Sequence, residues 1–264
     1  MRIATWNINS VRLRLDLVLR LLEEAQPDIL CLQETKCIDD LFPRQPFIDR
    51  GYGHIAVAGM KGYNGVAILS RLPIEAHAVT HWCGKEDCRH VAARLPGGIE
   101  VHSLYVPSGG DIPDPEQNPK FAHKLQFLDE MTAWWPQARQ PDDRMILVGD
   151  FNIAPLEHDV WSHKQLLDVV SHTPIEVEKL TAMQESIGWV DAVRRLVPED
   201  RKLYTWWSYR ARDWDVSDRG RRLDHVWVTP PLAPGLKGYG VVREARGWEP
   251  KPSDHVPVWV DLDV

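Results

Sequence analysis

The feature that most constrains the fold of this sequence is a series of short apolar segments, each with a polar side chain directly at one end. The segments with the length and apolar content of buried or half-buried strands are 2–8, 28–33, 65–70, 100–106, 145–148, 223–228 and 255–262. In the last of them, apolar and other residues alternate, as expected of a strand with one face in the core. We therefore expect the chain to fold around β-sheets.

Helical patterns lie between these segments. Leu15, Val18, Leu19 and Leu22 recur at helical spacing, and residues 120–135 form a second helical pattern. Strands alternating with helices are typical of α/β folds. With 264 residues and a hydrophobic fraction of 44%, the chain can bury a large core. Length alone also permits two small domains, but we expect residues 1–264 to form a single domain.

The sequence predicts a cytoplasmic protein. Its first residues, MRIATWNINS, lack the apolar stretch and cleavage site of a signal peptide. No run approaches the roughly 18 consecutive apolar residues that predict a membrane-spanning helix, so we expect no membrane partner. Four cysteines are too few for a disulfide-built scaffold in a chain of this size, which favours a reducing compartment.

The net charge of −7 argues against a protein that coats nucleic acid through an evenly basic surface. A site for a divalent metal concentrates carboxylates, however. An acidic total is therefore compatible with a basic groove around an acidic centre.

The polar residues at the segment ends are the candidate site. They are Asn7, Glu34, Tyr105, Asp150, Asn152, Asp224, Asp254 and His255. Taken singly, each has an ordinary alternative, such as a helix cap for Asn7 or a turn for Asp150 and Asn152. Together they supply what hydrolysis of a phosphodiester requires: oxygen ligands for a hard cation, a base for water, and hydrogen-bond donors for the phosphate oxygens. Their convergence predicts an active site.

Seven ordered motifs carry a resemblance to a known family. They are T-W-N-I-N, P-D-I-L-C-L-Q-E-T-K, N-G-V-A-I-L-S, L-Y-V-P, G-D-F-N-I-A-P, R-R-L-D-H and S-D-H-V-P, and they extend from residue 5 to residue 257. In this order they resemble the exonuclease III family of abasic-site endonucleases, in the endonuclease/exonuclease/phosphatase superfamily. The resemblance implies an α/β fold, a two-sheet β-sandwich flanked by helices (the DNase I-like four-layered fold), with the site at one edge.

The resemblance also implies roles for the candidate residues. The catalytic residues would be Tyr105, Asp150, Asn152, Asp224 and His255, and the ligands of Mg²⁺, which Mn²⁺ can replace, would come from Asn7, Glu34, Asp150, Asn152, Asp254 and His255. Asp150 would activate the attacking water or protonate the leaving oxygen, and Asn152 and Tyr105 would stabilise the phosphorane. His255, oriented by Asp224, would bind the phosphate or act as base.

The implied activity is incision of double-stranded DNA 5′ to abasic sites, 3′-to-5′ exonuclease action, or both, on abasic or 3′-blocked substrates and by a monomer. Substrate contacts require cations for phosphates and aromatic rings for an extruded nucleotide. The residues expected to supply them are Lys61, Asn64, Arg89, Trp206, Trp207, Arg210, Arg221 and Arg222. The alternative for two of the tryptophans in residues 201–222 is a place in the core.

Two of the departures from the family pattern lie at expected substrate contacts. Ser108 follows Val106-Pro107 where the family usually has Asn, which replaces an amide that faces the phosphate by a hydroxyl, and Asp218 stands where Asn is usual. Separately, His81, Cys83, Cys88 and His90 could be drawn as a zinc site, although their spacing matches no common zinc motif. The alternative is a solvent-facing loop whose Arg89 contacts DNA.

Other functions share this fold. Relatives hydrolyse sphingomyelin, inositol phosphates or messenger RNA tails, so the fold alone does not name the substrate. The Q-E-T-K ending and the Arg/Trp segment favour DNA. A catalytically inactive DNA-binding relative is the alternative from another class, and the retention of Glu34 and Asp150 argues against it.

Overall fold

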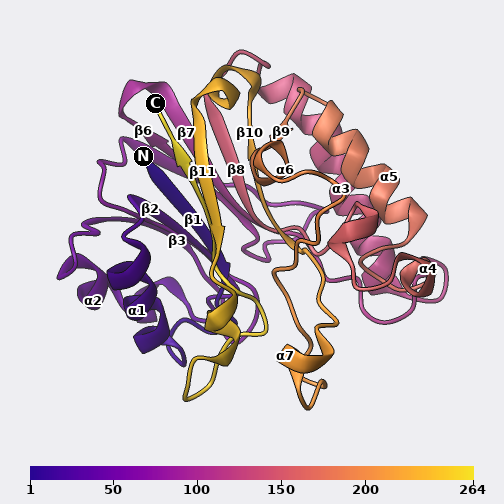
Figure 1. Cartoon of the computed structure of the whole chain (residues 1–264). Coiled ribbons are helices and arrows are strands. Elements are labelled where there is room, and N and C mark those ends of the chain that lie inside the picture. The colour runs from indigo at the N-terminus through magenta and orange to yellow at the C-terminus, as the bar shows by residue number, and fades with distance from the viewer.

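Two six-stranded β-sheets packed face to face form the centre of the computed structural model, which describes residues 1–264 (Figure 1). In spatial order, the first sheet consists of β11 (Leu236–Val241), β12 (Val258–Leu262), β1 (Arg2–Asn7), β2 (Ile29–Gln33), β4 (Val66–Ser70) and β3 (His54–Ala58). The second consists of β5 (Ala76–Val79), β6 (His90–Leu95), β7 (Ile99–Tyr105), β8 (Met145–Asp150), β10 (Asp224–Val228) and β9 (Val190–Asp191).

Helices cover the outer face of each sheet (Figure 1). The first sheet carries α1 (Leu15–Ala25) and α2 (Arg44–Ile48), and the second carries α3 (Pro119–Ala138) and α5 (Pro174–Glu185). The short helices are α4 (His163–Leu166), α6 (Ala192–Leu196), α7 (Trp214–Ser217) and the 3₁₀ segments η1 (Asp39–Leu41), η2 (Pro96–Gly98), η3 (Glu157–Asp159), η4 (Pro230–Gly235) and η5 (Arg243–Gly247). The predicted two-sheet sandwich flanked by helices is confirmed.

Three apolar layers hold these elements together. The inner faces of both sheets meet in one cluster, in which Ile3 and Ile68 of the first sheet join Val148 and Val226 of the second. A second cluster lies between the first sheet and α1, and a third between the second sheet and the helices α3 and α5. Burial of these side chains is the main stabilising contribution to the sandwich.

The strand directions bring many chain segments to one edge. β1 runs parallel to β2, and β7 runs parallel to β8. β12 is antiparallel to β1, and β10 is antiparallel to β8. The carboxyl ends of the four parallel strands therefore lie beside the amino ends of β10 and β12. These are the ends at which the predicted polar residues lie.

The last strand begins later than predicted, at Val258 instead of residue 255. Pro257 has no N–H to donate to a ladder. The segment before it pairs elsewhere: the N–H of Trp207 donates to the carbonyl of Asp254 (2.9 Å), and that of Val256 donates to the carbonyl of Thr205 (2.8 Å). This pairing places Asp254 and His255 at the sheet edge.

The longest helix, α3, has 20 residues and carries several charged side chains. None of the helices has the length and apolar character needed to span a bilayer.

Candidate active site

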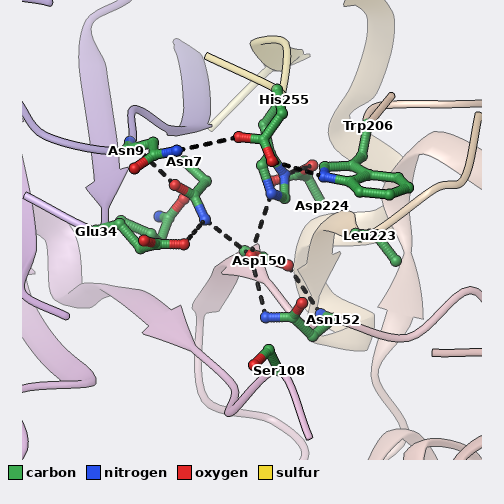
Figure 2. A network of polar contacts seen from close by, with 12 residues as sticks. Asn7, Asn9, Glu34, Ser108, Asp150, Asn152, Trp206, Leu223, Asp224 and His255 are labelled. Atoms are coloured by element: carbon green, nitrogen blue, oxygen red, sulfur yellow. Dashed lines mark hydrogen bonds and ion pairs between the residues drawn. The ribbon is translucent and has the colours of Figure 1, made fainter. Parts of the chain in front are cut away.

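The side chain of Asn7 connects the two sheets at the shared edge (Figure 2). Asn7 ends β1, and its Nδ2 donates to Oε1 of Glu34 and to Oδ2 of Asp150, both at 2.9 Å. Glu34 directly follows β2 of the same sheet, whereas Asp150 ends β8 of the other sheet. Residues distant in the sequence thus form one polar cluster at the edge of the sandwich.

The backbone at this edge adopts conformations that ordinary strands do not. Glu34 and Asn152 have left-handed φ values of 50° and 54°, which turn the chain sharply at the ends of β2 and β8. Gly149 allows close approach of β7 and β8, because a Cβ there would lie 1.9 Å from the carbonyl oxygen of Leu104. Such conformations cluster at functional sites, where the surrounding structure holds them in place.

Glu34 is surrounded by donors. The Tyr105 hydroxyl donates to Oε1 (2.9 Å), and Nζ of Lys36 lies 2.8 Å from Oε2. Burial raises the pKa of Glu34, but Lys36 and the Asn7 amide outweigh it and lower the pKa overall. Burial and the charge of Glu34 raise the pKa of Tyr105 well above its ordinary value, so the phenol remains a donor.

Asp150, His255 and Asp224 form a row at the centre of the site (Figure 2). Nδ1 of His255 donates to Oδ2 of Asp224 (2.8 Å), and Nε2 of His255 lies 3.6 Å from Oδ2 of Asp150. The hydroxyl of Thr205 donates to the same Asp224 oxygen (2.6 Å). The imidazole is therefore oriented with Nε2 toward Asp150.

This row has strongly perturbed proton affinities. Burial raises the pKa of Asp150 to about 7, and the charge of Asp224 adds to that effect. Burial lowers the pKa of His255, but the charges of Asp224 and Asp150 outweigh it and raise this pKa to about 10. Near neutral pH, His255 is thus a cation between two carboxyl groups, and Asp150 exchanges protons readily. Perturbed groups in a cleft are typical of acid-base catalysis.

Asn152 holds Asp150 in place. Its backbone N–H donates to Oδ1 of Asp150 (2.9 Å), and its side-chain Nδ2 donates to Oδ2 of Asp150 (3.1 Å) and to the carbonyl of Val106 (2.9 Å). Both amide protons are therefore engaged. A direct contact of Asn152 with a phosphate stays a prediction. The exposed Ser108 lies beside Asn152, and its hydroxyl is free to donate (Figure 2).

The ligand atoms available at this edge fit a hard divalent metal. Carboxylate and amide oxygens are the ligands that Mg²⁺ prefers, and Glu34 and Asn7 offer them beside Asp150. Ligand atoms of Asp150, Asp224 and His255 also lie within 4.8 Å of one another. One oxygen of Asp224 already accepts two hydrogen bonds. The group formed by Asp150, Asp224 and His255 is therefore better suited to holding a proton than a metal.

Asp254 lies beside this cluster and contacts Asn9, to which sequence reasoning had assigned no role, and Trp206, a predicted substrate contact. Its Oδ1 accepts from Nδ2 of Asn9 (3.3 Å) and its Oδ2 accepts from Nε1 of Trp206 (3.0 Å). Lys36 in turn donates to Oδ1 of Asn9 (2.6 Å). Asn9 stands two residues after Asn7 in T-W-N-I-N, and Lys36 ends Q-E-T-K, so both lay inside recognised motifs. Thr205 carried no such signal.

A cleft of ≈ 710 Å³ opens over the site. Trp206, Arg210 and Arg221 line it together with Asp150, Asn152, Asp254 and His255. The guanidinium of Arg221 lies 5.3 Å from the ring centre of Trp206. An adjoining recess of ≈ 490 Å³ contains Asn64 and Arg89, and Lys61 is exposed on the same loop as Asn64.

Two predicted substrate contacts are wrong. Trp207 is only 2% exposed, and it belongs to the apolar cluster beneath the first sheet. Arg222 is 1% exposed, and it pairs with Asp159 (3.0 Å) and Asp191 (2.6 Å). Both corrections have one cause. Trp206 and Arg221 form an isolated β-bridge and line the cleft, and adjacent side chains of an extended segment point to opposite sides, so Trp207 and Arg222 face inward.

The tentative zinc site is not formed. His81 is exposed, whereas His90 is buried in β6, where its Nε2 lies 2.9 Å from Nδ1 of His102. The side chains whose spacing does fit a metal ion are Asp150, Asp224 and His255 of the active site. Of this segment, Arg89 reaches the recess, with its guanidinium 4.8 Å from the ring centre of Tyr105.

Comparisons with known proteins agree with this geometry. The profile of the Endonuclease/Exonuclease/phosphatase family matches residues 4–255. Exodeoxyribonuclease III of Haemophilus influenzae is 28% identical, over 99% of this chain and 100% of that protein. An AP endonuclease structure from Archaeoglobus fulgidus (34% identity, TM-score 0.92) and the Neisseria 3′ phosphatase NExo bound to a product DNA hairpin (32%, 0.90) each align over 100% of both chains.

Proposed function

This chain belongs to the endonuclease/exonuclease/phosphatase family, and from that premise we propose that it is a metal-dependent DNA-repair phosphodiesterase. The observation that carries the proposal is the cluster at the sandwich edge, in which Asn7 joins the metal-binding candidate Glu34 to the acid-base row at Asp150. The names of its relatives, exodeoxyribonuclease III and AP endonuclease, point to DNA as the substrate.

The reaction is hydrolysis at phosphorus. Asp150, with a pKa raised to about 7, takes a proton from the attacking water or gives one to the leaving oxygen. His255, held protonated by Asp224, donates Nε2–H to a phosphate oxygen. Ser108 is a further donor in the cleft, and the Tyr105 hydroxyl, which donates to Glu34 (2.9 Å) in this structure, would be another once it turns from Glu34 to the phosphate. Together these groups offset the charge that develops on the pentacoordinate phosphorus.

The metal is Mg²⁺, which Mn²⁺ can replace. Glu34 would be its main ligand, with Asn7 and Asp254 as the other candidates, because Asn7 contacts Glu34 directly and Asp254 is connected to it through Asn9 and Lys36. When bound, the cation would neutralise phosphate charge and lower the pKa of a coordinated water. Lys36, which now contacts Glu34, is close enough to take part in the same charge balance.

The substrate is double-stranded DNA with an abasic or 3′-blocked site. The cleft combines an aromatic surface at Trp206 with the cations Arg210 and Arg221, and the adjoining recess adds Arg89. This local positive charge supplies phosphate contacts that the net charge of −7 does not suggest. We assign incision 5′ to the abasic sugar, 3′-to-5′ exonuclease action, or both, to this site.

Three further assignments belong to the same proposal. Residues 1–264 act as one catalytic domain, because both sheets supply groups to the site. The protein works as a monomer, since one chain provides every group of the cluster. It acts in the cytoplasm, as its four free cysteines suggest.

The test is a panel of labelled duplexes that carry an abasic-site analogue, a 3′-phosphate or no lesion, each incubated with Mg²⁺ and with chelator. A phospholipid and an RNA serve as control substrates. The proposal predicts cutting of a damaged duplex only with metal. Hydrolysis of a control substrate without DNA cleavage would overturn the DNA assignment and keep the fold and the site.

A further inference from the structure

Lys124 is a charged side chain buried in the N-terminal part of helix α3, beneath the active site. It is 0% exposed. Its Nζ lies 2.8 Å from the carbonyl oxygen of Asn152, 3.4 Å from that of Ser108 and 2.5 Å from Oε1 of Glu176. An ammonium group buried in this way is unfavourable unless every one of its protons has a partner. Lys124 has three such partners.

The partner Glu176 is itself fully engaged. It sits in the first turn of α5, and its carboxylate accepts hydrogen bonds from the N–H of Ser171 (2.9 Å) and from the hydroxyl of Thr173 (2.7 Å). The pair therefore fixes the position of the ammonium from the side opposite the active site. The remaining two contacts of the ammonium are the carbonyl oxygens of Asn152 and Ser108.

Those two carbonyls belong to separate loops that face the cleft. Ser108 lies between β7 and α3, and Asn152 follows β8 in a left-handed conformation (φ 54°). The stem of Lys124 also packs on the first loop, because a Cβ on Gly109 would lie 2.9 Å from Cδ of Lys124. Besides the direct bond from Asn152 to the Val106 carbonyl (2.9 Å), this one side chain thus connects the loop with the free Ser108 hydroxyl to the loop that holds Asp150.

We propose that Lys124 is a positioning residue for phosphodiester hydrolysis: it holds the Asn152 and Ser108 loops at the separation that one phosphate requires. This inference rests on the proposed function and deepens it. Asn152 fixes both oxygens of Asp150, so a shift of its carbonyl moves the acid-base group relative to the donors on the other loop. A misplacement of about 1 Å is enough to slow an enzymatic step about 100-fold.

A purely structural role for Lys124 has a matched control in the same helices. Lys179 of α5 and Asp129 of α3 form an exposed ion pair (2.6 Å) that also connects the two helices but does not contact either loop. Lys179→Met removes that connection. It should leave cleavage unchanged.

The experiment compares Lys124→Met, Lys124→Met with Glu176→Gln, Glu176→Gln alone and Lys179→Met, in the full chain. The double variant leaves no unpaired charge in the core. Glu176→Gln retains an amine that donates to both carbonyls even when it is uncharged. For each variant we would measure the single-turnover rate at saturating abasic duplex with Mg²⁺, the Kd for that duplex in chelator, and the Tm.

The proposal predicts the wild-type rate for Lys179→Met, a smaller loss for Glu176→Gln, and a loss of about 10- to 100-fold for Lys124→Met and for the double variant. The Kd should stay within about threefold, since Lys124 touches no substrate. A double variant that cleaves at the wild-type rate would overturn the inference. Equal losses in Glu176→Gln and Lys124→Met would also overturn it, and this comparison remains decisive if the double variant does not fold. Absence of cleavage by the wild-type protein would instead overturn the proposed function.

Discussion

Nε2 of His255 lies 3.6 Å from Oδ2 of Asp150, while Nδ1 of the same ring donates to Asp224. The imidazole thus connects a carboxylate that orients it to a carboxyl group whose pKa is raised to about 7. In the proposed reaction His255 stays protonated and meets a negatively charged phosphate, and Asp150 is the group that would change its protonation during a turnover.

Asp150→Asn should abolish most of the activity and preserve DNA binding. The amide keeps the shape of the side chain but neither takes nor releases a proton in this pH range. We expect the rate of cleavage to fall by about 10²- to 10⁴-fold or more, the usual contribution of a positioned acid or base. Single-turnover cleavage beside a DNA-binding measurement in chelator checks this. Cleavage at the wild-type rate would remove Asp150 from the mechanism.

Asp224→Asn should lower the pKa of His255. With the charge of Asp224 removed, burial is opposed mainly by Asp150, so the pKa of the imidazole should fall below its value of about 10. NMR titration of the imidazole in metal-free protein, assigned with His255→Gln, measures this directly. The cleavage rate at neutral pH should fall by about 10²- to 10⁴-fold. An unchanged imidazole titration would show that Asp224 does not set its charge.

Trp206 and Trp207 are adjacent but should respond differently to replacement by Ala. Trp206 lines the cleft, so its loss should weaken DNA binding by about 1–3 kcal/mol, as for other stacking aromatic side chains. Trp207 is core, so its loss should lower the free energy of unfolding by about 3–5 kcal/mol. Binding titrations and urea unfolding of both variants test the pair. Equal effects of the two substitutions on both measurements would contradict the assignment.

Stability should decrease as the pH falls below about 6.5 because of the buried pair His90 and His102. Burial lowers the pKa of both side chains in the folded protein, whereas in the unfolded chain each takes a proton near pH 6.5. Below that pH the unfolded state therefore binds more protons, and each histidine contributes a loss of up to about 1.4 kcal/mol per pH unit.

His90→Gln tests this contribution. Urea unfolding at about pH 7.5 and about pH 5.5 gives the loss of stability on acidification, and this loss should be smaller in the variant by roughly 1 kcal/mol. An identical loss in both proteins would mean that folding does not lower the pKa of His90.

Much of the fold could be predicted from sequence because the central strands are apolar on both faces. β1, β2, β8 and β10 are almost wholly buried, so their segments are continuous apolar runs with polar residues at the ends. The strands β3, β5, β6, β9 and β11 were not predicted. Of these, β5 is exposed along its whole length and β11 is partly exposed, which leaves no hydrophobic pattern to recognise in either.

The site was partly accessible for the same reason. Polar residues at the ends of buried strands are visible in sequence, but their partners are not. Which face of residues 201–222 is buried depends on pairing with Asp254 and Val256, and this decides that Trp206 lines the cleft while Trp207 enters the core. Lys124 appeared to be one more residue of a surface helix, and only the tertiary structure places it beneath Asn152.

The most direct test of the central claim is cleavage of an abasic duplex in water enriched in ¹⁸O, followed by mass spectrometry of both products. If metal-aided water attacks phosphorus 5′ to the lesion, the phosphate on the 5′ side of the abasic sugar gains one ¹⁸O atom and the upstream strand ends in an unlabelled 3′-hydroxyl. Cleavage without ¹⁸O in the phosphate would indicate elimination at the sugar and would contradict the hydrolytic role of this site.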